Sequence, residues 1–123
     1  MINASITKRK NGSYNVKVSV VEFREGDTYI IYCPALDLSG YGESDTEAKK
    51  SFEIVLHEYI RYADNKGTLN DDLIAHGWKK RGKTTSMVPP SMTQLLTSNE
   101  NFSRIFNKQP SYQKYDMPVE VAI

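Results

Sequence analysis

Carboxylates are the side chains with the clearest capacity for chemistry in this 123-residue chain. Small metal-dependent nucleases need acidic residues that converge at strand ends, and the candidates are Glu22, Asp27, Asp37 and Glu53. However, Asp27 falls in a predicted turn and Glu53 follows Phe52 on a predicted helix. We therefore expect no convergent metal site.

The two histidines and the single cysteine form no recognisable catalytic or metal-binding group. His57 has no second histidine four residues on, so we interpret it as a boundary or surface residue. His76 precedes Gly77 and is interpreted as a cation near a helix C-terminus. Cys33 ends an apolar run beside Pro34 and is interpreted as a small buried strand residue, not a nucleophile. There is also no phosphate loop or dinucleotide-binding glycine pattern, so the sequence predicts a binding protein, not an enzyme, with no cofactor.

Basic residues form a second group with a possible function. Residues 79–123 carry seven Lys/Arg against three Asp/Glu, whereas residues 1–78 carry nine against twelve. The excess is concentrated in Lys79, Lys80, Arg81 and Lys83, which could contact the phosphates of a nucleic acid. The alternative is that these residues form a solvated loop.

The elements that position these residues follow from hydrophobic periodicity. Residues 14–23 alternate as a strand, residues 28–33 form a near-continuous apolar strand, and residues 38–43 form a short extended piece punctuated by two glycines. A long helix follows, with a capping-box spacing at Ser44 and Glu47 and a glycine stop at Gly67. Its apolar positions recur at helical spacing: Ala48, Phe52, Val55, Leu56, Tyr59, Ile60 and Ala63. The fold class is therefore α+β, an antiparallel three-stranded meander packed by one long helix.

The rest of the chain predicts shorter elements. Asn70 should cap a short helix that ends at Gly77, and Trp78 should anchor it against the core. Residues 84–90 are expected to be a loop or edge segment, followed by two short helices at residues 91–96 and 99–106. A terminal strand with alternating Met117, Val119, Val121 and Ile123 should either join its own sheet or pair across a two-fold axis in a homo-oligomer, with Pro118 favouring an edge or a bulge.

The size of the chain predicts one domain with a small appendage: a core at residues 1–78 and a basic C-terminal extension at residues 79–123. One cysteine allows no internal disulfide. Residues 1–10 lack the apolar region of a secretory signal, and no run is apolar enough to span a membrane. We expect a soluble, cytoplasmic protein.

The central stretch resembles the HicB family of antitoxins. The family's strand end, Cys-Pro-Glu-Leu or a variant, corresponds to residues 32–36 (Tyr-Cys-Pro-Ala-Leu), and its Gly-x-Thr-x-Glu-Glu-Ala helix start corresponds to residues 42–48 (Gly-Glu-Ser-Asp-Thr-Glu-Ala). The match runs from about residue 14 to residue 67. Ala35 replaces the usual acidic residue, and residues 37–39 (Asp-Leu-Ser) replace the usual Pro-Gly-Cys.

The resemblance implies a degenerate ribonuclease H-like βββαβ fold without its catalytic carboxylates. It implies a type II antitoxin that binds and neutralises a small HicA-like mRNA-cleaving toxin and possibly binds operator DNA to regulate its own transcription. The expectation of a dimer or larger homo-oligomer comes from the terminal strand. Residues 79–123 match neither DNA-binding tail that is common in the family. The alternatives are a nucleic-acid-binding regulatory module without a toxin partner, and a small metal-dependent nuclease.

Overall fold

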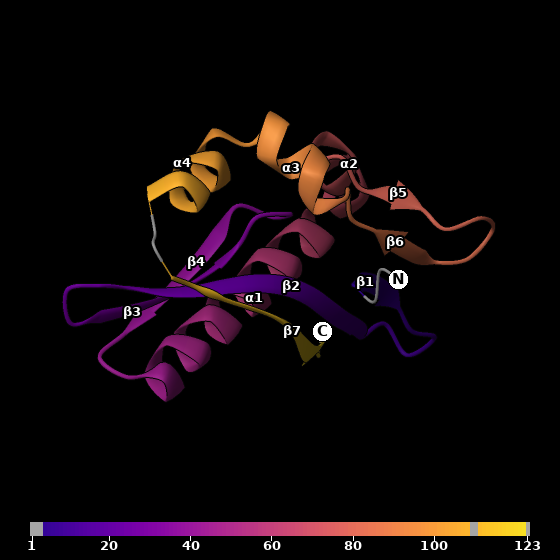
Figure 1. The fold of residues 1–123 in the computed structure, drawn as a ribbon. Helices are drawn as coiled ribbons and strands as arrows, with labels where there is room; N and C mark the ends of the chain where they lie inside the picture. Colours follow the sequence, from indigo (N-terminus) through magenta and orange to yellow (C-terminus); the bar gives the residue numbers. More distant parts are fainter. Residues whose placement is uncertain (1–3, 109–110, 123) are drawn as a thin grey trace.

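The computed structural model describes residues 4–108 and 111–122. Their strands and helices pack around one hydrophobic core (Figure 1). The elements in chain order are β1 (Ser5–Lys8), β2 (Tyr14–Glu25), β3 (Thr28–Cys33), β4 (Leu38–Gly42), α1 (Asp45–Lys66), α2 (Leu69–Ala75), β5 (Lys79–Lys80), β6 (Ser86–Val88), α3 (Met92–Ser98), α4 (Glu100–Lys108) and β7 (Gln113–Val121).

The long strand β2 is the axis of the sheet. The strands run in the order β4-β3-β2-β1-β6-β5, and β7 also pairs with β2; every pairing is antiparallel. Because β7 pairs with residues 14–22, it occupies most of one edge of β2. Strands β1 and β3 must therefore share the other edge, where β1 pairs with residues 14–17 and β3 with residues 21–25.

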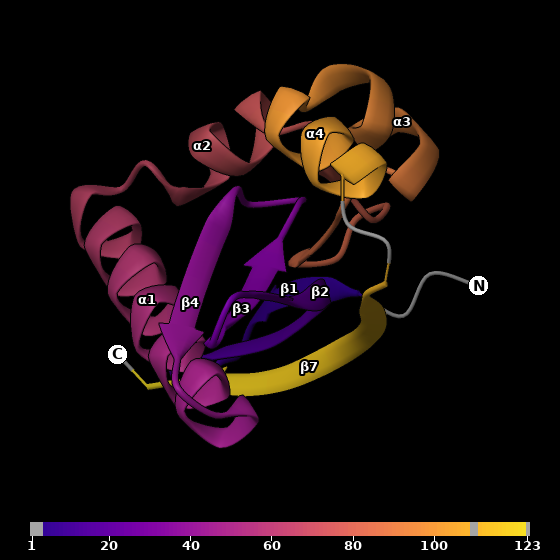
Figure 2. The same cartoon turned by 60° about the vertical axis from the view of Figure 1, so that its left-hand side comes forward.

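Both faces of the sheet are covered. Tyr14, Val16, Val18 and Val20 point to the side of α1, and the residues opposite them on β7 share that face. Val21 and Phe23 point to the other side and are also buried, so the end of this strand is covered on both faces. Figure 2 shows α1 on one side of the sheet, at the left of the view, whereas α3 and α4 lie together at the top.

Helix α1 agrees with its prediction. The hydroxyl of Ser44 accepts a hydrogen bond from the backbone N–H of Glu47 at 3.1 Å, and Gly67 caps the other end in the left-handed conformation with φ 71°. The second half of the expected capping box differs, because the Glu47 carboxylate lies 3.4 Å from the Ser44 hydroxyl. The buried stripe consists of Ala48, Phe52, Leu56, Ile60 and Ala63.

Three details after α1 differ from the sequence expectation. Helix α2 begins at Leu69, so the prediction that Asn70 caps it is wrong; the capping residue is Thr68, which makes no side-chain cap bond. Residues 79–80 form strand β5. Residues 86–88 form β6, which pairs with β1 on one side and β5 on the other, so this segment is neither a loop nor an edge.

Other expectations for this region are confirmed. Trp78 is buried, and its indole N–H donates to the carbonyl oxygen of Ala35 at 2.8 Å. Helices α3 and α4 occupy the places of the two short helices. The terminal strand, β7, joins its own sheet; its predicted member Ile123 lies outside the described residues. Within the described part of the chain, no helix has the length and apolar character needed to cross a membrane.

Candidate functional site

The end of β3 and the following strand, β4, pack closely against α1. Cys33 is fully buried, and burial raises the pKa of its thiol to about 12, so the thiolate is disfavoured at neutral pH. The interpretation of Cys33 as a small buried strand residue is confirmed. A Cβ atom at Gly40 would lie 2.3 Å from the backbone nitrogen of Phe52, and one at Gly42 would lie 2.5 Å from that of Ala48. Both glycines are therefore needed for β4 to lie directly against the helix.

The loop after β3 connects the sheet to α3 and α4. The Tyr32 hydroxyl donates a hydrogen bond to the Asp37 carboxylate. The backbone of Asp37 is in the left-handed conformation, with φ 55°. Asn99, between α3 and α4, donates to the Tyr32 hydroxyl at 2.9 Å and to the Pro34 carbonyl at 3.1 Å. Burial and the Asp37 carboxylate raise the pKa of Tyr32, so its hydroxyl remains a donor at neutral pH. A polar cleft of about 790 Å³ opens beside this loop and is lined by Asp37, His76 and Asn101 among others.

The basic cluster from the sequence lies on the hairpin formed by β5 and β6. Lys79, Lys80, Arg81 and Lys83 are all exposed. A tight turn closes the hairpin, with the N–H of Thr84 donating to the carbonyl of Arg81 at 3.1 Å. Lys79 is opposite Val88 and Lys80 is opposite Met87, so these neighbouring lysines point to opposite faces of the sheet. Lys79 lines the polar cleft, whereas Lys80 lines a separate hollow of about 350 Å³.

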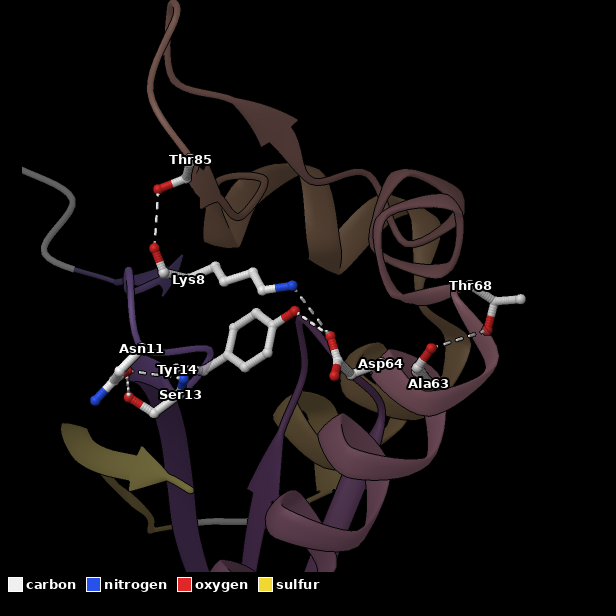
Figure 3. A network of polar contacts seen from close by, with 8 residues as sticks. All are labelled: Lys8, Asn11, Ser13, Tyr14, Ala63, Asp64, Thr68 and Thr85. Atoms are coloured by element: carbon white, nitrogen blue, oxygen red, sulfur yellow. Dashed lines mark hydrogen bonds and ion pairs between the residues drawn. The ribbon is translucent and has the colours of Figure 1, made fainter. Parts of the chain in front are cut away.

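A second basic turn lies beside this hairpin. It joins β1 to β2 and contains Lys8, Arg9 and Lys10; it is closed by the N–H of Gly12, which donates to the carbonyl of Arg9 at 3.0 Å. The hydroxyl of Thr85 donates to the carbonyl of Lys8 at 3.1 Å, which fixes the hairpin to this turn (Figure 3). Nothing local to residues 8–12 in the sequence indicates that residue 85 is a neighbour.

The Lys8 side chain extends towards the C-terminal end of α1. Its ammonium lies 3.8 Å from Asp64, which also accepts a hydrogen bond of 2.6 Å from the Tyr14 hydroxyl (Figure 3). Burial and this carboxylate raise the pKa of Tyr14. Arg9 makes an ion pair of 3.4 Å with Glu120 on β7. The basic turn is therefore held by contacts to both α1 and β7.

The four candidate carboxylates lie on separate elements. Asp27 is in the turn between β2 and β3, Asp37 is in the loop after β3, and Glu53 is on the exposed side of α1. Glu22 lies instead beside Asp45, the first residue of α1, and accepts a hydrogen bond of 2.6 Å from the Tyr115 hydroxyl. Across the residues that the structure describes, no three His, Cys, Asp or Glu side chains are grouped closely enough to hold a metal ion.

The contact between Glu22 and Asp45 shifts the two carboxyl groups in opposite directions. Burial raises the pKa of Glu22. The pKa of Asp45 is lowered by Glu22, which donates a hydrogen bond to it when protonated, and by the Lys49 ammonium, 3.1 Å from Asp45. The sequence analysis missed Asp45 and Tyr115 because the first is typical of a helix N-terminus and the second is far away in the chain.

The histidines occupy peripheral positions. His57 is partly exposed on α1, as expected for a boundary residue. His76 is the C-terminal capping residue of α2, and its ring Nδ1 lies 2.9 Å from the carbonyl oxygen of Asp72.

No known protein family, curated protein or solved structure matches the chain at the level that marks a relative.

Proposed function

We propose that this chain is a HicB-like antitoxin that binds and neutralises a small HicA-like mRNA-cleaving toxin of a type II system. Its role would be to cover a partner protein in the cytoplasm as a homo-oligomer, without catalysis of its own. In this proposal β2, β3, β4, α1 and β7 supply the βββαβ order of a degenerate ribonuclease H-like fold.

One observation carries the proposal: the residues of the HicB-like signature form one continuous structural unit. The buried strand end at Cys33, the two glycines of β4 that contact α1 and the Ser44 cap of that helix lie in consecutive elements. The dispersed positions of Asp27, Asp37 and Glu53 also fit a protein that acts by binding.

Co-expression with the product of an adjacent small gene tests this function. We expect the full chain to restore growth of cells that express this partner, and the two proteins to copurify. The partner alone should cleave mRNA, and an unrelated small basic protein should not copurify. Neither rescue nor a complex with any adjacent gene product would contradict the proposal.

A purified sample tests the nuclease alternative. The nuclease hypothesis requires the chain itself to cleave RNA or DNA when Mg²⁺ or Mn²⁺ is added. We expect no cleavage above that of a Glu22→Gln, Asp45→Asn double variant. Cleavage that depends on the metal and is lost in the double variant would replace the antitoxin proposal by a nuclease.

A further inference from the structure

Two basic turns that are far apart in the sequence lie next to one another in the structure. The register Thr7 to Ser86 runs antiparallel, so the turn that follows β1 and the turn that precedes β6 lie at the same end of the sheet. Their hydroxyl groups, Thr7 Oγ1 and Ser86 Oγ, are 2.7 Å apart, and the Thr85 bond to Lys8 adds a second link. Both turns are on the right of Figure 1.

The two turns, which hydrogen bonds hold together, present a cluster of cations. We define the basic end as Lys8, Arg9, Lys10, Lys80, Arg81 and Lys83, which are all exposed. Lys8 and Lys80 line the same hollow on the side of α1. Asp64 and Glu120 make ion pairs with Lys8 and Arg9, whereas the structure shows no ion pair for the other four within the residues it describes. Lys79 is excluded because it points to the opposite face.

The composition of the basic end indicates the kind of partner. None of the large exposed apolar side chains of the described residues belongs to either turn. Protein interfaces need an apolar centre, and proteins that bind single strands need aromatic side chains on which bases can stack. Exposed cations on two adjacent turns are suited to binding the phosphates of a duplex, because both of its strands carry closely spaced negative charges.

We propose that the basic end binds the phosphate backbone of double-stranded nucleic acid without reading its sequence. Lysine and arginine side chains on both turns would contact phosphates, and the hydrogen bonds between β1 and β6 would hold the turns at a fixed separation. This binding site does not depend on the proposed toxin partner, and it uses the residues 8–10, which the charge of the C-terminal extension alone would not indicate.

Fluorescence anisotropy with mixed-sequence DNA and RNA duplexes, titrated at several salt concentrations, tests the site. The variant is Lys10→Gln, Arg81→Gln, Lys83→Gln, and the matched control is Lys50→Gln, Arg104→Gln, Lys108→Gln, which removes the same charge from exposed positions on α1 and α4. Each lost phosphate contact should reduce the slope of log K against log salt by about 0.9, so we expect a reduction of about 2–3 for the first variant and little for the second.

A second variant keeps the proposal falsifiable if the first one folds poorly. Glu120→Gln removes the carboxylate that lies 3.4 Å from Arg9, so duplex binding should tighten at low salt. Glu25→Gln makes the same change of charge on the opposite end of β2 and should not match that gain. Absence of salt-sensitive binding to either duplex, equal loss in the two triple variants, or equal gain in the two glutamine variants would overturn the proposal.

Discussion

Gly40 shows how a single residue type determines the separation of two elements. Its missing side chain lets the backbone of β4 contact that of α1 at Phe52, where a Cβ atom would meet backbone atoms that cannot rotate away. The close contact also covers Phe52, which is fully buried. The glycine of this strand is therefore a packing requirement and not only a mark of a turn.

Gly40→Ala should destabilise the fold by about 3 kcal/mol or more, because either β4 or α1 must move to accommodate the added methyl group. Chemical denaturation followed by circular dichroism measures this loss. The control is Gly26→Ala in the turn between β2 and β3, where nothing lies within 4 Å and only the φ of 60° opposes the change. That control should lose about 1–2 kcal/mol. Equal losses would show that the contact with α1 does not matter.

At the scale of elements, Glu22, Asp45 and Tyr115 connect β2, α1 and β7. Two carboxylates meet there, and the raised pKa of Glu22 records the free energy required to ionise it in the folded state. A raised carboxyl pKa favours folding below the unfolded-state value, and this contribution is lost as pH rises through the folded-state value. Ionisation of Glu22 therefore opposes folding.

Glu22→Gln should accordingly stabilise the protein at pH 7, by about 0.5 kcal/mol because the site is partly exposed. The amide can still accept the hydrogen bond from Tyr115. Thermal denaturation at pH 7 and at pH 4 measures the effect, and the gain should shrink at the lower pH, where Glu22 is mostly protonated in both states. Glu25→Gln, on the same strand but exposed, is the control. A loss of stability at pH 7 would mean that the charged form of Glu22 is favourable.

Elements whose signals are local could be predicted from the sequence. Helix α1 has its cap, its apolar stripe and its glycine stop within one stretch, and the structure has all three. Strand β5, in contrast, is short and fully exposed, and its existence depends on pairing with β6. The prediction that Asn70 caps α2 is wrong because the helix begins immediately after Gly67, with Thr68 as its capping residue. Asn70 therefore lies inside the first turn of α2.

The candidate site was predicted in part for the same reason. Lys79, Lys80, Arg81 and Lys83 form a visible run of charge, whereas the turn at residues 8–12 joins them only through the pairing of β1 with β6. A contact between residues so far apart has no local signature. Likewise, the opposite directions of Lys79 and Lys80 follow from a strand that the sequence did not indicate.

At the scale of the whole molecule, β7 returns the chain to its first long strand. It pairs with β2 from Tyr14 to Glu22, and its buried Met117, Val119 and Val121 extend the core beneath α1. Among the described residues β7 pairs with β2 alone, so its outer side is an edge of the sheet, and Pro118 lies there as expected. Both of the regions predicted from composition thus contribute strands to one sheet.

One shared sheet predicts one cooperative unfolding transition. Val119→Ala should lower the free energy of unfolding by about 1–2 kcal/mol. The unfolding transition monitored by the fluorescence of Trp78, the single tryptophan, should shift by the same amount as the transition monitored by circular dichroism, although Trp78 packs against Ala35 in another part of the core. Glu120→Ala, the exposed neighbour on the same strand, should shift both signals by less than about 0.5 kcal/mol. If Trp78 kept its wild-type transition in Val119→Ala, β7 would have to detach from the sheet on its own.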